Sequence, residues 1–113
     1  MVQNRIEVNG NTMFFDELRA WFVDQQATLT LRGLTVKLGA SPEDSRDKPS
    51  LCLDIDSPSR LGQLILWSSG EAELQLANMA SGKVVTRHYD ITSRTALDDA
   101  LESLLAWVTP GLK

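Results

Sequence analysis

The sequence predicts an α+β fold: an antiparallel five-stranded sheet, arranged as a meander, with an N-terminal and a C-terminal helix packed on one face. Between Leu51 and Ile91, four runs of strand-like composition are separated by SPSR, SSG and MASG, which contain the Ser, Pro and Gly residues typical of chain reversals. A fifth run precedes them, and an amphipathic stretch lies on either side of the set. Two amphipathic helices need one apolar surface to cover, and a twisted sheet offers it.

The first amphipathic stretch predicts a helix that begins at Asn11 or Thr12, either of which can act as the N-cap, and ends at Gly33. TLTL at residues 28–31 is strand-like by propensity, which leaves an earlier end open. The apolar side chains recur at spacings of three and four residues, and they are Phe14, Phe15, Leu18, Trp21, Phe22 and Leu29.

The strands are predicted from alternation. Leu34, Val36 and Leu38 alternate with polar residues, which is typical of a half-buried first strand. Residues 39–50, GASPEDSRDKPS, are too polar for a core and are expected to form a surface loop. The remaining runs are expected to be four consecutive strands, and the segment at residues 61–67 is apolar on both of its faces.

A second helix is expected to close the fold. Thr95, followed three residues later by Asp98, resembles a capping box, and Pro110 is expected to end the helix. Its apolar stripe has helical spacing and consists of Leu97, Leu101, Leu104, Leu105 and Val108.

If both helices cover one face of the sheet, the other face is free to bind a partner. The residue parity that points outward cannot be fixed across turns of uncertain length, so the outward set is an expectation. It consists of Asp54, Asp56, Glu71, Glu73, Gln75 and the part of the two-sided strand around Ile65 and Trp67.

Length and composition indicate which classes of protein the chain can belong to. The chain has 113 residues, enough for a core without staples, and we expect residues 1–113 to be a single domain with residues 1–10 as an extended arm or an added edge strand. Fifteen acidic against eleven basic residues argue against nucleic-acid binding and favour a basic partner. One cysteine, no signal peptide and no long apolar run favour a reducing cytoplasm and argue against a membrane span.

The paired carboxylates are the first candidate sites. Asp54 and Asp56 lie two residues apart on one strand, so they share a face, and Glu71 and Glu73 repeat this spacing. Each pair could hold a metal or act as an acid/base couple, but no third ligand or histidine is spaced nearby. We therefore interpret both pairs as solvated polar surface, suited to Lys or Arg of a partner if they lie close together. No metal, cofactor or catalytic residue is expected.

Several single residues are further candidate sites. His88 could be a general base and Cys52 a reactive thiol, but a strand-surface histidine and a half-buried small side chain are the simpler interpretations. Trp21 and Trp107, on the helices, are expected to pack in or beside the core. Trp67, at the end of a strand beside a tight turn, is the first choice for a binding anchor.

The segment from Leu61 to Asp90 resembles the central pattern of the TriTu family of bacterial immunity proteins. A strand leads into Trp-x-Ser-Gly, and an acidic and apolar strand, a Ser-Gly turn, a strand with an aromatic residue and a Leu-rich helix follow. In this sequence these parts are 62–67, Ser69-Gly70, 71–76, Ser81-Gly82, His88-Tyr89 and 97–108. The first helix, Gly33 and Pro49-Ser50 also fit, so the resemblance covers nearly the whole chain.

The resemblance implies a cytoplasmic protein, not an enzyme, that binds and neutralises a cognate polymorphic toxin by occlusion. Under this hypothesis Trp67 anchors the complex, and Asp54, Asp56, Glu71 and Glu73 attract a basic toxin surface. Two other classes stay open, a small acidic secretion chaperone or adaptor for an exported effector and, less well supported, a small enzyme. Neither the oligomeric state nor the activity of the toxin follows from the sequence.

Overall fold

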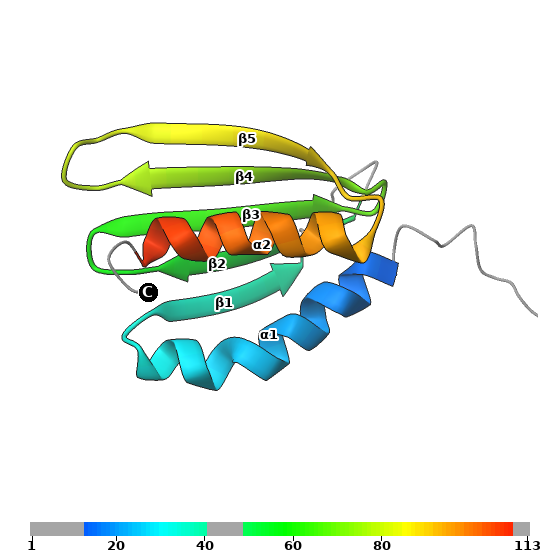
Figure 1. Cartoon of the computed structure of the whole chain (residues 1–113), viewed down its shortest axis with the longest axis horizontal. Coiled ribbons are helices and arrows are strands. Elements are labelled where there is room, and N and C mark those ends of the chain that lie inside the picture. The colour runs from blue at the N-terminus through cyan, green and yellow to red at the C-terminus, as the bar shows by residue number, and fades with distance from the viewer. Residues whose placement is uncertain (1–12, 41–48, 110–113) are drawn as a thin grey trace, which may run out of the picture.

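The predicted α+β meander is confirmed. The structure is a computed structural model that describes residues 13–40 and 49–109. Its five strands form one sheet in the order β1-β2-β3-β4-β5, and every neighbouring pair is antiparallel (Figure 1). The elements are α1 (Met13–Leu31), β1 (Thr35–Ala40), β2 (Ser50–Asp56), β3 (Arg60–Trp67), β4 (Glu71–Asn78), β5 (Val84–Asp90) and α2 (Arg94–Val108).

Some sequence predictions fall outside the described residues. They are the arm at residues 1–10, the N-cap at Asn11 or Thr12, most of the polar connection, at residues 41–48, and the helix stop at Pro110.

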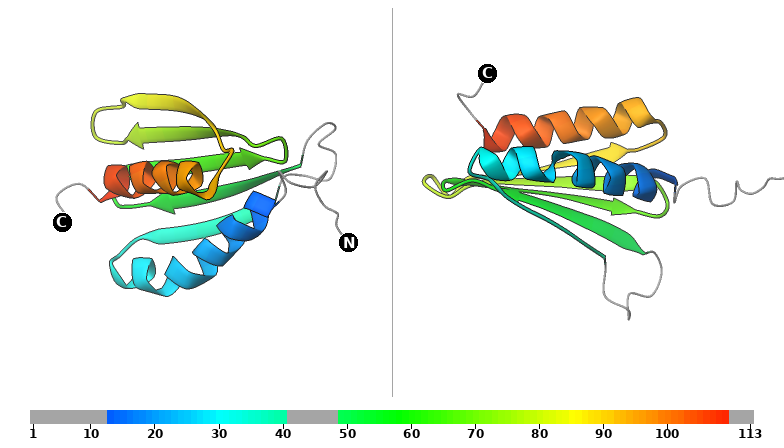
Figure 2. Two further views of the ribbon diagram at one scale, coloured as in Figure 1. Left: turned by 45° about the vertical axis from the view of Figure 1, so that its right-hand side comes forward. Right: turned by 90° about the horizontal axis from the view of Figure 1, so that it is seen from below.

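Both helices lie on one face of the sheet, as predicted (Figure 2). α2 runs along β3 and also contacts β2, β4 and β5, whereas α1 packs against β1 and against α2. The core between the layers is built mainly from aliphatic side chains of the two helices and of β1 to β4, and Val85 and Tyr89 of β5 pack against it. Those with almost no exposed surface are Leu18, Leu53, Ile55, Leu64, Leu66, Leu74, Ile91, Leu97, Leu101, Leu104 and Val108.

α1 continues through the strand-like TLTL segment and ends at Leu31. Leu29 is buried in the core, so tertiary packing outweighs the weak β propensity of the threonines. Gly33 follows with φ of 92°, a left-handed conformation that favours glycine, and the N–H of Leu34 donates to the carbonyl of Leu29 at 3.1 Å. The predicted stop at Gly33 is therefore confirmed.

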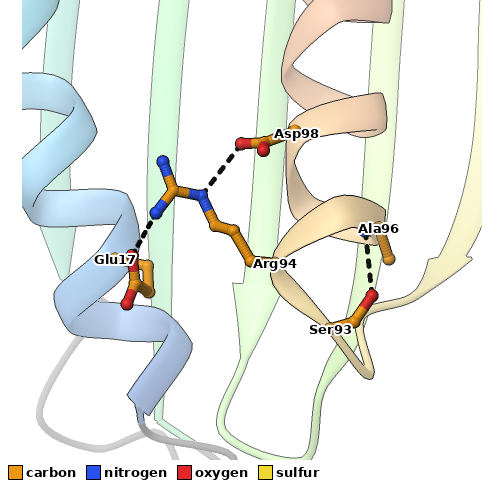
Figure 3. Close-up of polar contacts among 5 residues, drawn as sticks. All are labelled: Glu17, Ser93, Arg94, Ala96 and Asp98. Carbon is orange, nitrogen blue, oxygen red and sulfur yellow. Dashed lines mark hydrogen bonds and ion pairs between the residues drawn. The ribbon is translucent and has the colours of Figure 1, made fainter.

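The predicted cap of α2 is wrong by two residues. The N-cap is Ser93, whose Oγ accepts a hydrogen bond from the N–H of Ala96 at 3.1 Å, and Thr95 lies inside the helix (Figure 3). Asp98 has a different role from that in a capping box: its Oδ1 accepts from Nε of Arg94 at 2.9 Å. The same guanidinium forms an ion pair with Glu17, which ties the start of α2 to α1 (Figure 3).

Candidate interaction surface

The strand register fixes which side chains point away from the helices. Asp54 lies opposite Gln63, and Gln63 lies opposite Gln75, so these three residues share a face. In the next row Cys52, Ile65, Glu73 and His88 are neighbours across the sheet. All members of the predicted outward set lie on this face, which we call the open face: Asp54, Asp56, Ile65, Trp67, Glu71, Glu73 and Gln75.

The two acidic pairs do not form one compact cluster. β3 separates β2 from β4, so carboxylates on these two strands are about 10 Å apart even where they are level. They are also staggered, because Asp54 is level with Gln75 while Glu73 is level with Cys52. The carboxylates therefore follow a diagonal across the sheet.

Acidic residues nevertheless dominate the open face. Five of the fifteen acidic residues of the chain point outward from the strands, whereas Lys37 is the only lysine or arginine among the described strand residues on this face. Asp90, which was not in the predicted outward set, also lies on this face, opposite Glu71 on the neighbouring strand. Asp90 lies two residues from His88 on the same strand and therefore shares its face. The register that pairs His88 with Glu73 then places Asp90 on the open face. Among the described strand residues, the open face therefore carries five acidic side chains against one basic side chain.

Asp56, on the open face, has a raised pKa. Partial burial raises its pKa above the ordinary aspartate value, and the carboxylate of Asp54 raises it further. A hydrogen bond from the backbone N–H of Gly62 and the charge of Lys37 act in the opposite direction. Asp54 itself accepts a hydrogen bond from Nε2 of Gln63 at 2.9 Å. The pair is therefore held in place by its neighbours on β1 and β3.

A hollow of about 310 Å³ opens beside this aspartate pair. Asp54, Asp56, Gln63 and Gln75 form its polar part. An apolar row formed by Leu61, Ala77 and Val84 lines the rest, and Leu61 and Val84 are exposed. Such a site suits a basic side chain, because the apolar row can contact its aliphatic stem and the carboxylates its charged end.

Trp67 lies at the opposite end of β3, where the chain turns into β4. The N–H of Gly70 donates to the carbonyl of Trp67 at 2.9 Å, and Gly70 has φ of 96°. The Ser-Gly part of the sequence motif thus shapes the turn beside the tryptophan. Trp67 is half-buried and lies opposite Ser50 on β2.

The other two tryptophans pack beside the core, as predicted. Among the described residues, the side chains that pack against the core include Trp21 and Trp107 but not Trp67. Nε1 of Trp107 donates to the carbonyl of Ala77 at 3.1 Å, and the guanidinium of Arg60 lies over its ring, 4.5 Å from the centroid.

The remaining candidates also match their simpler interpretations. His88 is an exposed strand residue whose Nε2 lies 3.4 Å from Oδ1 of Asp90. Cys52 is half-buried, and burial, together with the charge of Asp54, raises the pKa of its thiol, which keeps it protonated and weakly nucleophilic. Within residues 13–40 and 49–109, no group of three or more His, Cys, Asp or Glu side chains is placed to hold a metal ion.

The comparisons with known proteins agree with the motif. A family model described as immunity protein TriTu matches residues 16–107, most of the chain. No curated protein and no solved structure gives a significant match. In the part of the chain that the structure describes, neither helix is long and apolar enough to cross a membrane.

Proposed function

Because the chain belongs to the TriTu family of immunity proteins, we propose that it protects the producing cell by binding one cognate toxin domain in the cytoplasm. In this proposal the open face and its adjoining turns cover the active site of the toxin or lock its conformation, and the protein acts by occlusion without catalysing a reaction. The observation that carries the proposal is the acidic open face, which no described helix covers.

The size of the open face is compatible with a specific complex. Five strands spaced by about 4.8 Å give a width of about 24 Å, and seven residues at about 3.3 Å each give a length of about 23 Å. The flat area is then about 550 Å², against about 800 Å² per partner in a standard interface. The side-chain relief and the turns at either end of the strands supply the difference.

Three parts of the open face have separate roles in the proposal. Trp67 provides a desolvated anchor, since tryptophan is enriched among the residues that dominate binding energy. Asp54, Asp56, Glu71 and Glu73 speed the encounter with a basic toxin surface by long-range attraction. The hollow beside Asp54 and Asp56 receives a lysine or arginine of the toxin, which fixes the orientation of the complex.

The experiment that tests this function is affinity capture from lysate of the native organism with the tagged full chain, followed by binding measurements with the purified partner. We expect the capture to recover one large exported protein that binds through a folded toxin domain with a nanomolar Kd. A variant with Trp67→Ala, Asp54→Asn and Asp56→Asn should lose this partner, while Val23→Ala, exposed on α1, should keep it. Binding instead to an unfolded segment of an exported protein would replace the proposal with a secretion chaperone.

A further inference from the structure

β5 is the last strand of the sheet, and the edge that it presents is uncovered in the described structure. No described helix or strand lies beyond it, whereas α1 runs alongside β1 at the other edge (Figure 1). β5 contains Val84, Val85, Thr86 and Tyr89, which favour extended backbone, and has no proline or glycine. A seven-residue edge strand of this kind can pair with a further strand.

The hydrogen-bond pattern shows which backbone groups of β5 are free. The N–H of Asn78 donates to the carbonyl of Lys83, and the N–H of Ile91 donates to the carbonyl of Gly70. Hydrogen-bonded and non-hydrogen-bonded pairs alternate along an antiparallel ladder, so Val85, Arg87 and Tyr89 bond to β4. The N–H and C=O groups of the residues between them point out of the sheet edge, and these residues are Val84, Thr86, His88 and Asp90.

The side chains beside this edge define the chemistry of a pairing strand. On the helix side, the exposed guanidinium of Arg87 lines a hollow of about 250 Å³ that Ser103, Ala106 and Trp107 also line. No described residue forms a hydrogen bond or ion pair with the side chain of Arg87. Val85 and Tyr89, two residues away on either side, pack against the core and present apolar surface.

We propose that the toxin domain adds an antiparallel strand to β5, with an acidic side chain opposite Arg87 and apolar side chains opposite Val85 and Tyr89. Arg87 directs its own backbone groups to β4, so it forms a non-hydrogen-bonded pair with the added strand. In such pairs the opposed side chains are closest, and opposite charges stabilise the pair. This inference rests on the proposed immunity function and concerns a different surface from the open face.

A second copy of the chain fits this edge less well. Two antiparallel β5 strands that pair over their full length place Arg87 opposite the Arg87 of the other copy, and like charges directly opposite destabilise a sheet. A shift by two residues avoids this pair but leaves five of the seven residues of each strand paired. A toxin strand with a carboxylate opposite Arg87 forms an ion pair with it and can pair with all seven residues of β5.

Backbone amide hydrogen exchange tests strand addition directly. It is measured for the full chain alone and in complex with the captured toxin domain, which carries a substitution that abolishes its activity. In the free chain Thr86 and His88 should exchange fast, and binding should slow them at least about tenfold, as main-chain pairing requires. Val85, Arg87 and Tyr89 are internal controls, because β4 protects them in both states. Unchanged exchange at Thr86 and His88 in a saturated complex would overturn the inference. Slow, concentration-dependent exchange in the free chain would assign the edge to a second copy and also overturn it.

Two matched pairs of variants give an independent test. Thr86→Pro removes an outward N–H without removing a bond to β4 and should weaken binding at least about tenfold, whereas Thr86→Val should bind within about twofold of the parent chain. Arg87→Glu should weaken binding more than Arg32→Glu. The second variant is the control, because it makes the same change of charge at the residue that follows α1 and not on β5. A folded Thr86→Pro variant that binds normally would exclude β5 pairing. Failure of the parent chain to bind any toxin domain would remove the proposed function and this inference together.

Discussion

The backbone of Gly62 in β3 lies directly beneath the side chain of Leu104 in α2. A β-carbon at Gly62 would overlap Cδ1 of Leu104 and would come within 3.2 Å of Cγ1 of Val108. Leu104 and Val108 are themselves buried, so neither can move into free space. This close approach holds α2 on the middle of the sheet and leaves the opposite side of the same strand for the open face.

Gly62→Ala should therefore destabilise the fold by about 1–3 kcal/mol, the usual cost of overpacking a core. Gly39→Ala is the matched control, since a β-carbon at Gly39 would have no atom within 4 Å. Chemical denaturation of the two variants measures the difference in unfolding free energy. Equal stability would contradict the packing described for α2.

Trp67→Ala should weaken binding of the toxin domain by more than about 1 kcal/mol, mostly through faster dissociation. Because Trp67 is only half-buried, the variant should remain folded. Surface plasmon resonance separates the two rate constants, and Val23→Ala provides an exposed apolar control on α1. A folded Trp67→Ala variant with parental affinity would remove the anchor from the proposal.

Neutralising both acidic pairs should reduce the salt dependence of association. The variant combines Asp54→Asn, Asp56→Asn, Glu71→Gln and Glu73→Gln, and its association rate should vary less with ionic strength because screening then has fewer charges to act on. The control changes acidic residues on the helices, Asp24→Asn together with Glu102→Gln. Stopped-flow measurements at several salt concentrations compare the three proteins. An unchanged slope for the fourfold variant would exclude electrostatic attraction through the open face.

Asp56 should make the stability of the fold depend on pH. Its pKa is raised in the folded protein, so ionisation favours the unfolded chain, and the contribution of Asp56 to stability is lost as the pH rises through the folded pKa. Asp56→Asn should therefore be at least as stable as the parent at pH 7, with the difference vanishing below pH about 4. The effect should be small, because the carboxyl is only partly buried and water screens it. Denaturation curves across this range measure it, and a variant less stable than the parent at pH 7 would contradict the assignment.

Cys52 should react slowly with iodoacetamide in the folded protein. Its raised pKa lowers the thiolate fraction at neutral pH, and half-burial limits access. Mass spectrometry should record faster alkylation in urea, where both effects disappear. Equal rates in the folded and unfolded states would show that Cys52 is reactive.

Local patterns in the sequence predicted most of the fold. Alternation in 51–56 and 71–76, together with short turns, determined the strands and their order, because side chains on a strand alternate between faces. The Thr95 cap was wrong because Ser93 and Thr95 are both acceptable caps, and the choice depends on where the chain leaves β5. The TLTL segment is helical because Leu29 is buried in the core, and this tertiary contact could not be predicted from the local sequence.

The candidate surface could be predicted only in part. The outward residues were correctly named, but the sequence did not fix the register between neighbouring strands. The diagonal arrangement of the carboxylates and the position of Asp90 therefore needed the structure. The hollow beside Asp54 and Asp56 and the free edge of β5 depend on residues from several strands, and therefore on the three-dimensional structure.

Titration of the activity of the toxin domain with the purified chain measures neutralisation itself. We expect the activity to fall in proportion to the added protein and to reach zero at one equivalent, since a tight complex occludes each toxin molecule. The variant with Trp67→Ala, Asp54→Asn and Asp56→Asn should require a large excess. Full toxin activity in the presence of a saturating amount of the folded parent chain would contradict neutralisation by binding.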